Sequence, residues 1–384
     1  MKNTLSADTL IKTAQTTTGL KDFGRDTWKQ GLDAFIYSLN TDLNMTDMTA
    51  GYFTGVITQL LANRLEVTQL IENHPQILEE KIEQPIIITG LPRTGTSLLQ
   101  ILLSLDPTTR FIRNWESSMA ICPPPELVHS STDPRIQAYH LAMEGFFGVM
   151  PKLRGINGIN FMAGGPAECQ NLMAHEFIHF GYSAGSSLFS YGEWLSECNM
   201  AHAYQYHKKL LQVLQWKMPD EKWVLKAPMH LFGLDHLLET YPDARVVFTH
   251  RDPIKAMSSG ASMVYHWTLF STQQADTAAI GKWWPKIWAK GMERALKVRD
   301  NFNPTQFFDL YHKNFSQDPI GAVHEIYDHF NLCVGKGHLR RMQAWLRDNP
   351  RSRFGNHDHT PAQFELNPKK VKEQFQFYCD RFDV

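Results

Sequence analysis

The spacing of apolar residues along the chain changes near residue 85. Before it, in the segments 32–39 and 57–65, apolar side chains recur every three or four positions, which is the spacing of one buried helix face. After it, short β-branched runs alternate with helical patterns. We therefore expect residues 1–84 to form a helical N-terminal extension that packs on a core of a different class.

Four short apolar runs predict buried strands in that core. They cover residues 85–89, 223–226, 245–250 and 305–310, and helical patterns separate them. Strands separated by helices pair in parallel. The expected fold class is therefore α/β, with a parallel β-sheet flanked by helices. In such sheets ligands bind beyond the carboxyl ends of the strands.

The remaining patterns divide the chain further. We expect the α/β core to span 85–335. Residues 113–200 read as a long, irregular insertion, and 260–300 carries closely spaced tryptophans. We expect the first to form a cap beside the strand ends and the second to form lid helices, ordinary apolar core being the alternative for both. Residues 336–384 are expected to form C-terminal helices and a tail.

Composition limits the classes of partner. The 384 residues carry a net charge of −1, whereas general nucleic-acid binding needs a basic surplus. No run reaches the ~18 apolar residues of a membrane span, and the first residues lack the apolar stretch of a signal peptide. The five cysteines are scattered, without metal-ligand spacing, which fits reduced thiols. We therefore expect a cytoplasmic protein with no metal site, no nucleic-acid partner and no membrane span.

A glycine-bounded loop, residues 90–97, joins the first strand to a helical pattern. Such loops bind anions through backbone N–H groups and the helix N-terminus. Gly90, Gly95 and Ser97 match the Walker A pattern, but Thr96 stands where that pattern has lysine. The sheet is therefore expected to be of P-loop type. Without that lysine the loop is poorly suited to a nucleoside triphosphate. It can still bind an anionic group, with Arg93 as the positive charge.

Two further strand ends carry a cation. Lys226 ends the run 223–226, and Arg251 directly follows 245–250, with Ser259 eight residues further on. In a parallel sheet both lie at the edge that carries the loop. Together these three motifs resemble the sulfotransferases that use 3′-phosphoadenosine 5′-phosphosulfate (PAPS). The nearest resemblance is to bacterial members with LPRTGTS-type loops, which are related to the tyrosylprotein sulfotransferases.

The resemblance implies an activity and a donor site. The activity is transfer of the sulfuryl group of PAPS, by in-line displacement and without a metal, to an acceptor hydroxyl or less readily an amine. The loop would hold the 5′-phosphosulfate, while an arginine fork and a hydroxyl would hold the 3′-phosphate. A tyrosine would lie near the nucleoside, and a basic tail (Arg347, Arg351 and Arg353) would close over the 3′-phosphate. The predicted donor-binding residues are Arg93, Thr94, Gly95, Thr96, Ser97, Arg251, Ser259 and Tyr311.

The resemblance also implies catalytic residues. Lys226 and Arg93 would stabilise the negative charge that develops during transfer; a lysine that merely reaches the sheet edge is the alternative for Lys226. Glu116 lies near the position where tyrosylprotein sulfotransferases carry a catalytic glutamate, and we predict that it is the general base. The alternative for Glu116 is an ion pair with Arg110 or Arg113.

Histidines provide rival bases and acceptor contacts. Cytosolic small-molecule sulfotransferases use a histidine base, so His140, His175 and His230 stay open as rivals to Glu116. Glu168 and His175 lie in the insertion, and His230 closely follows Lys226. We predict that Glu168, His175 and His230 contact the acceptor, with an ordinary salt bridge as the alternative for Glu168. The acceptor is expected to be a small molecule or peptide with a hydroxyl group, and the oligomeric state stays open.

Two other functions stay open. A P-loop nucleotide or nucleoside kinase is disfavoured because Thr96 replaces the phosphate-binding lysine. A non-catalytic nucleotide-binding module is disfavoured because Lys226 and Glu116 are both present. Binding of ATP with magnesium would favour the kinase. Binding of the desulfated product adenosine 3′,5′-bisphosphate (PAP) would favour the sulfotransferase.

Overall fold

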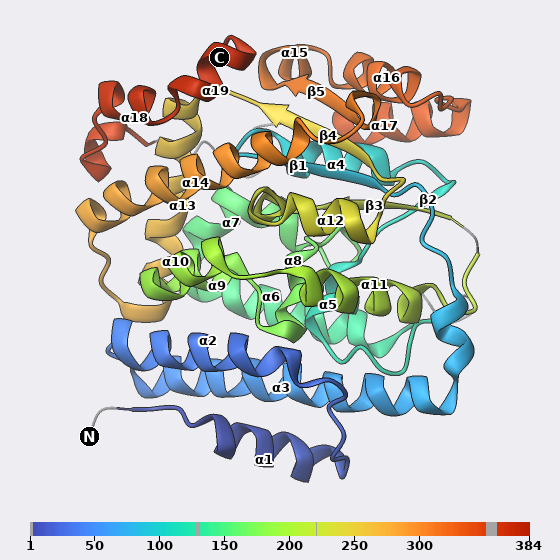
Figure 1. Cartoon of the computed structure of the whole chain (residues 1–384), viewed down its shortest axis with the longest axis vertical. Helices are drawn as coiled ribbons and strands as arrows, with labels where there is room; N and C mark the ends of the chain where they lie inside the picture. The colour runs from blue at the N-terminus through green and yellow to red at the C-terminus, as the bar shows by residue number, and fades with distance from the viewer. Residues whose placement is uncertain (1–2, 127–130, 220, 351–358) are drawn as a thin grey trace.

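A parallel sheet lies near the C-terminal end of the molecule (Figure 1). The computed structural model describes residues 3–126, 131–219, 221–350 and 359–384. Within these residues the sheet has five strands in the order β2-β3-β1-β4-β5, and all neighbours pair in parallel. The strands are β1 (Ile86–Gly90), β2 (Thr109–Arg110), β3 (Lys222–Lys226), β4 (Arg245–His250) and β5 (Phe307–Tyr311).

The four predicted strands are present, so the α/β class with a parallel sheet is confirmed. The strand β4 has the predicted bounds, and β1 and β3 differ from theirs by one residue. The strand β5 starts two residues later than predicted because Pro304–Gln306 forms a short 3-10 turn. The strand β2 was not predicted, because two residues are too short to show an apolar alternation.

Helices cover both faces of the sheet, because successive side chains of a strand point to opposite sides. Ile86 and Ile88 of β1 belong to one apolar cluster, with α4 (Thr96–Ser104), α16 (Pro319–His329) and α17 (Lys336–Asp348). Ile87 belongs to another cluster, with α12 (Leu234–Thr240) and α14 (Thr277–Arg299). The other helices after residue 250 are α13 (Pro253–Thr272), α15 (His312–Gln317), α18 (Pro368–Gln374) and α19 (Gln376–Phe382).

The N-terminal residues form helices, as their periodicity predicts. They are α1 (Ala7–Thr18), α2 (Lys29–Asp42) and α3 (Asp47–Asn73), and they lie at the end of the molecule farthest from the C-terminus (Figure 1). Buried residues of α2 and α3 belong to the same apolar cluster as β4 and α14. Arg64 of α3 also forms a buried ion pair with Glu176 at 2.7 Å. The extension therefore shares one core with the middle of the chain.

The segment 113–200 is helical rather than irregular, so that expectation is wrong. It contains α5 (Asn114–Ser118), α6 (Pro134–Val149), α7 (Pro151–Asn157), α8 (Gln170–Met173), α9 (Phe180–Ser186) and α10 (Phe189–Glu197), and α11 (Ala201–Gln215) follows it. Most of these helices are too short to show a period. The longest, α6, has apolar residues on all sides and therefore no amphipathic pattern.

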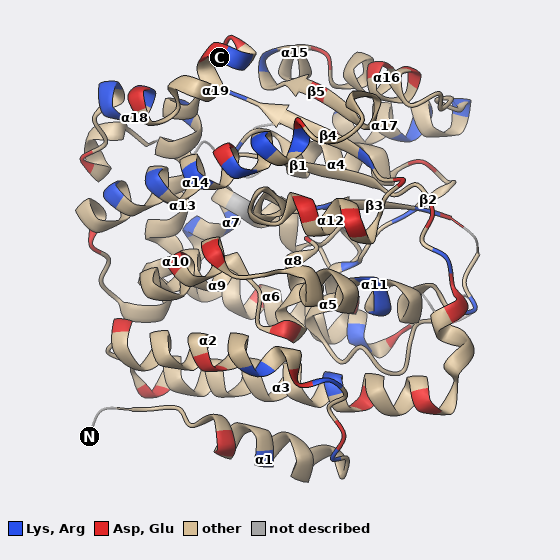
Figure 2. Cartoon of the chain, viewed as in Figure 1, with Lys and Arg blue, Asp and Glu red and all other residues tan. Residues whose placement is uncertain are grey.

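Charged residues are spread over the surface. Figure 2 shows acidic and basic side chains interspersed along the helices of both halves, in keeping with the net charge of −1. Across the described part of the chain, no helix combines the length and the apolar character that crossing a bilayer requires.

Candidate active site

The loop after β1 has an unusual backbone conformation, with three residues at positive φ. Gly90, Arg93 and Gly95 all have positive φ, at 139°, 68° and 95°, and Gly95 directly precedes the first turn of α4. The Thr94 hydroxyl lies 2.6 Å from both Leu91 O and Thr249 Oγ1, so it fixes the shape of the loop from inside. The amides at the start of α4 are left to bind an anion.

Replacing Gly95 with alanine is expected to weaken binding of PAP, the ligand that the family resemblance implies for this loop, by about tenfold or more. Its φ of 95° is strained for any residue with a Cβ. The added Cβ would also lie 3.2 Å from Phe315 Cδ1 and 3.4 Å from His312 Cδ2. The loop must therefore move away from its anion-binding shape. Calorimetric titration with PAP measures the effect, and Gly145→Ala, at a glycine with no neighbour within 4 Å of the added Cβ, is the control.

Two arginines meet beside this loop. Arg251 Nη1 donates a hydrogen bond to Arg93 O at 2.6 Å, and Arg93 Nε donates to Ser259 Oγ at 3.1 Å. Among the described residues neither arginine forms an ion pair with a carboxylate. Burial, and then the nearby charge of Arg251, lower the pKa of Arg93 to about 10, so both remain charged at neutral pH. The site therefore has an excess of positive charge, which fits an anionic ligand.

Lys226, at the end of β3, forms an ion pair with Glu168. The lysine side chain is 1% exposed and the glutamate 24% exposed. Gln170 Nε2 donates to the second carboxylate oxygen, and Gln170 Oε1 in turn accepts from Gly181 N at 3.2 Å. Both carboxylate oxygens of Glu168 therefore have a partner, and its side chain is still partly exposed. The pair forms because Cys169 N donates to Lys226 O at 2.8 Å, which brings this segment alongside the end of β3.

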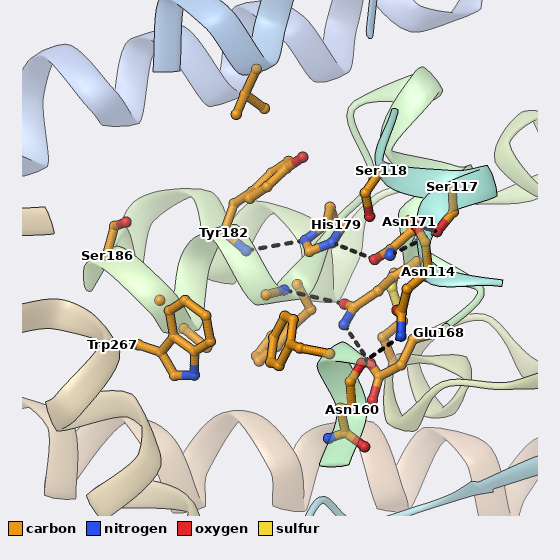
Figure 3. A pocket seen from close by; sticks show the side chains of 18 of the residues that line it. Asn114, Ser117, Ser118, Asn160, Glu168, Asn171, His179, Tyr182, Ser186 and Trp267 are labelled. Atoms are coloured by element: carbon orange, nitrogen blue, oxygen red, sulfur yellow. Dashed lines mark hydrogen bonds between the residues drawn. The ribbon is translucent and has the colours of Figure 1, made fainter. Parts of the chain in front are cut away.

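Glu168 and Arg93 both line a cavity of about 490 Å³, here called the aromatic cavity. One wall is apolar and aromatic, with Phe146 in ring contact with both Trp267 and Phe270, at centroid distances of 5.2 and 5.1 Å. The other wall is polar, and Figure 3 shows its residues on the side of Glu168, across from Trp267. They are Asn114, Ser117, Ser118, Asn160, Asn171 and His179. Of the described lining residues, Glu168 is the only carboxylate.

His179 is a cavity residue that the sequence analysis missed. Its Nδ1 accepts a hydrogen bond from Tyr182 N at 3.2 Å, so Nε2 carries the proton and donates to Asn171 Oδ1 at 3.3 Å. Asn171 Nδ2 then donates to Ser117 Oγ at 3.1 Å. Burial lowers the pKa of His179 to about 3. The imidazole therefore stays neutral and orders the polar wall. A lone histidine without a motif gave no signal for it.

Glu116, the predicted base, lies outside the aromatic cavity. Its side chain is fully buried. One oxygen accepts from Arg113 N at 2.9 Å and the other from Arg113 Nη1 at 2.6 Å, which together cap the start of α5. The structure therefore gives Glu116 the alternative role, an ion pair with Arg113. Its position argues against a part in proton transfer.

The three histidines also lie away from the cavity wall. His175 bonds to Asn63 Nδ2 and Leu172 O, and burial lowers its pKa to about 4. His230 is buried against the Tyr204 hydroxyl at 2.8 Å, and burial lowers its pKa as well. His140 is exposed on α6. None of them lines the aromatic cavity, so their positions argue against contact with the acceptor and against proton transfer.

A second hollow, here called the basic pocket, lies at the ends of β4 and β5. Its volume is about 650 Å³, and Arg251, Tyr311 and Lys313 are among the residues that line it. Tyr311 thus lies beside Arg251, as the predicted nucleoside site requires. Arg347 of the predicted tail is exposed and pairs with Asp348 at 2.9 Å, while Arg351 and Arg353 lie outside the described residues. The described residues contain no cluster of three or more metal-ligating side chains.

Comparison with known proteins identifies the class. The model of the sulfotransferase family matches residues 85–334, which is more than half of the 384 residues. The chain belongs to this family. The resemblance predicted from the sequence motifs is therefore confirmed at the level of the family, and with it the enzyme class of sulfotransferases.

Individual relatives agree with this placement. Sulfotransferase STF9 from Mycobacterium avium has 28% identity and a TM-score of 0.90, with 100% of this chain and 98% of that chain covered. Sulfotransferase STF1 from Mycobacterium tuberculosis has 28% identity and a TM-score of 0.82, with 98% and 99% covered.

A curated relative is similar over a shorter stretch. The omega-hydroxy-beta-dihydromenaquinone-9 sulfotransferase Stf3 of Mycobacterium bovis is 24% identical over 162 residues. That match covers 41% of this chain and 40% of the relative, so it spans less than half of either protein.

Proposed function

We propose that the protein transfers the sulfuryl group of PAPS to a hydroxyl group of an acceptor bound in the aromatic cavity. The observation that carries the proposal is the placement of Glu168 and Lys226. Their ion pair lies at the wall of the cavity that also contains Arg93, Thr96 and Ser97 of the anion-binding loop. A proton acceptor, one cation and residues of the anion-binding loop thus border the same space, and Lys226 lies buried behind Glu168.

The residues present fit PAPS as the donor, and the family generally uses it. Arg93, the amides of the loop and the hydroxyls of Thr96 and Ser97 are suited to the phosphosulfate. Arg251 and Ser259 are suited to the 3′-phosphate, because a fork of N–H donors matches a phosphate dianion. Both arginines lack a carboxylate partner among the described residues, so a bound anion would supply their missing charge. Tyr311 lines the basic pocket together with Arg251, which supports its assignment to the nucleoside.

The chain supplies the proton chemistry. When bound, PAPS would supply a sulfuryl group whose sulfur bonds to the acceptor oxygen as its bond to the 5′-phosphate oxygen breaks, and PAP would leave. Glu168 accepts the proton of the acceptor hydroxyl, and the carboxylate becomes a neutral acid. Its attraction for Lys226 then falls, so the lysine ammonium becomes available to negative charge elsewhere in the site. Lys226 and Arg93 therefore stabilise charge where it develops, which is the largest catalytic effect in many enzymes.

The cavity favours an apolar or aromatic acceptor with one hydroxyl group. Phe146, Trp267 and Phe270 provide the apolar wall, and Glu168 would meet the hydroxyl. The name of the Stf3 relative specifies an omega-hydroxylated dihydromenaquinone, which is an alcohol of this kind. A carbohydrate, which carries many hydroxyl groups, is a poorer fit to that wall. We place the protein in the cytoplasm, because its five free cysteines suit a reducing compartment.

Thermal unfolding with PAP tests the proposal. A ligand at 100 times its dissociation constant adds roughly 2.7 kcal/mol to the stability of the protein that binds it. We therefore expect PAP to raise the melting temperature by a few degrees, and ATP with magnesium to raise it less. A rise with ATP and magnesium alone would favour the kinase, and no rise with either would favour a non-catalytic module.

A further inference from the structure

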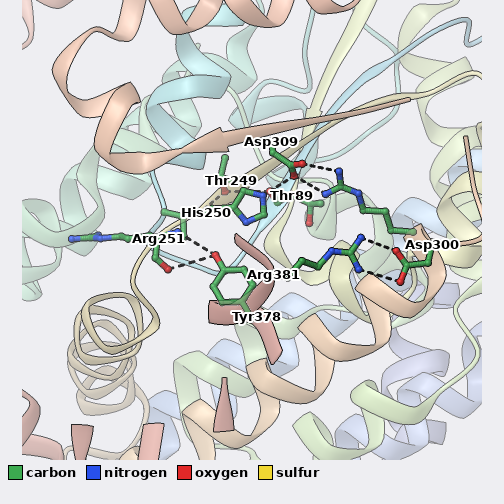
Figure 4. Close-up of polar contacts among 10 residues, drawn as sticks. Thr89, Thr249, His250, Arg251, Asp300, Asp309, Tyr378 and Arg381 are labelled. Carbon is green, nitrogen blue, oxygen red and sulfur yellow. Dashed lines mark hydrogen bonds and ion pairs between the residues drawn. The ribbon is translucent and has the colours of Figure 1, made fainter. Parts of the chain in front are cut away.

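The C-terminal helix α19 packs against the end of β4 that carries Arg251. The Tyr378 hydroxyl accepts a hydrogen bond from Arg251 N at 3.2 Å and lies 3.5 Å from Arg251 O. Figure 4 shows both contacts, with the Tyr378 ring next to the backbone turn after His250. The two residues are 127 positions apart in the sequence. The contact therefore joins the last helix to the anion site.

The same strand end is held from a second side. His250 Nε2 and Asp309 Oδ1 of β5 are 2.7 Å apart. Arg299 of α14 binds both oxygens of Asp309 at 2.6 and 2.8 Å. Phe382 of α19 stacks on the His250 ring, with centroids 3.9 Å apart and planes at 23°. The backbone at residue 250 is therefore fixed by β5 and α19 together.

A further ion pair holds α19 in place. Arg381 binds both oxygens of Asp300, at the end of α14, at 2.7 and 3.1 Å, as Figure 4 also shows. The helix is thus tied to α14 by charge, to His250 by stacking and to Arg251 by its tyrosine. Tyr378 thus contacts the backbone of Arg251, whereas the guanidinium of Arg251 donates to the carbonyl of Arg93 in the loop.

The Tyr378 contact matters because Arg251 lies beyond the last pair of the β4–β5 ladder, so no neighbouring strand holds its backbone. The ladder between β4 and β5 ends at the pair His250 and Tyr311, and α13 begins two residues after Arg251. The Arg251 amide thus lies in a short turn, and the Tyr378 hydroxyl is the hydrogen-bond acceptor for it. Without that bond the turn gains freedom, and the guanidinium at its end loses its fixed position.

We propose that α19 is a clasp for the donor nucleotide and that Tyr378 is its positioning residue. Tyr378 acts through the backbone of Arg251, and so sets the affinity for the 3′-phosphate rather than the rate of transfer. The proposal rests on the proposed function only in that Arg251 binds the donor. The predicted basic tail involves other residues, so the role of Tyr378 and α19 is an addition to the sequence analysis.

The test compares two conservative variants, Tyr378→Phe and Tyr327→Phe, by calorimetric titration with PAP. Each removes one buried hydroxyl, and Tyr327 donates to Asp106 Oδ2 at 2.9 Å, on the opposite edge of the sheet from Arg251. Loss of one hydrogen bond of this kind corresponds to roughly 3- to 12-fold in a binding constant. We expect Tyr378→Phe to weaken PAP binding by about that factor, and Tyr327→Phe to leave it unchanged.

The outcomes separate the clasp from the proposed function. If the unaltered protein does not bind PAP, the donor assignment fails and the clasp fails with it. If it binds PAP and Tyr378→Phe binds equally well, only the clasp is overturned. Equal weakening by both variants would mean a general loss of stability and would also overturn it. A Tyr378→Phe enzyme with a raised KM for PAPS and an unchanged kcat would support the clasp.

Discussion

Replacing Glu168 with glutamine is expected to lower kcat by about 10²- to 10⁴-fold, the usual contribution of a positioned general base. Glutamine keeps the size of the side chain and can still accept a hydrogen bond from Gln170, but it cannot take a proton from the acceptor and no longer forms an ion pair with Lys226. Transfer of sulfate from labelled PAPS to a panel of apolar alcohols measures the loss. Binding of PAP is expected to stay within about twofold, because Glu168 lies on the acceptor side of the loop.

The matched control is Glu116→Gln. This substitution breaks the ion pair with Arg113 and the cap of α5, so it is expected to lower stability by about 1–3 kcal/mol while kcat changes little. The two variants together decide between the carboxylate that the family resemblance predicted and the one that the geometry favours. A large loss of kcat in Glu116→Gln, with full activity in Glu168→Gln, would refute our assignment.

Replacing Arg93 with alanine is expected to lower kcat/KM by about 10²- to 10³-fold. Arg93 is the loop cation that borders both the anion site and the aromatic cavity, and removal of one preorganised charge from a transition state costs about that factor. Steady-state assays with varied PAPS measure it. Arg93→Lys is expected to recover only part of the loss, because an ammonium group cannot reproduce the fork of donors.

A surface arginine provides the comparison for Arg93. Arg154 is 42% exposed and pairs with Glu144 at 2.8 Å, so Arg154→Ala is expected to change kcat/KM by less than about twofold. Turnover by Arg93→Ala at a rate close to that of Arg154→Ala would rule out the loop as the phosphosulfate site. The pair of variants therefore tests the loop without reference to the identity of the acceptor.

The strands and the positions of the three cations could be predicted because each depends on residues that are close together in the sequence. A buried β-branched run forms a strand wherever it packs, and parallel pairing then places Arg93, Lys226 and Arg251 at one edge. No such rule governed the partner of Lys226. Glu168 is 58 residues away in the sequence, in a helical segment whose short elements have no readable period. Only tertiary packing brings the two together.

The prediction of Glu116 as the base has a related limit, because a sequence position does not show what a side chain contacts in the fold. Glu116 was selected by position relative to a motif, yet that position also suits a helix cap, and Arg113 three residues earlier satisfies both of its oxygens. A glutamate three residues after a residue that begins a helix is a common capping arrangement. The polar wall around His179 and the contact of Tyr378 with Arg251 depend on residues with no motif at all.

The meeting of Arg93 and Arg251 has a practical consequence for work with the purified enzyme. The charge of Arg251 disfavours the charge of Arg93, and neither guanidinium forms an ion pair with a carboxylate among the described residues, so a bound anion would relieve the repulsion. Inorganic sulfate or phosphate in a buffer can meet that need. Such buffers should raise the melting temperature of the protein. Because the anion competes with the donor for the same site, they should also raise the apparent dissociation constant for PAPS. Storage conditions and assay conditions for this enzyme therefore need different salts.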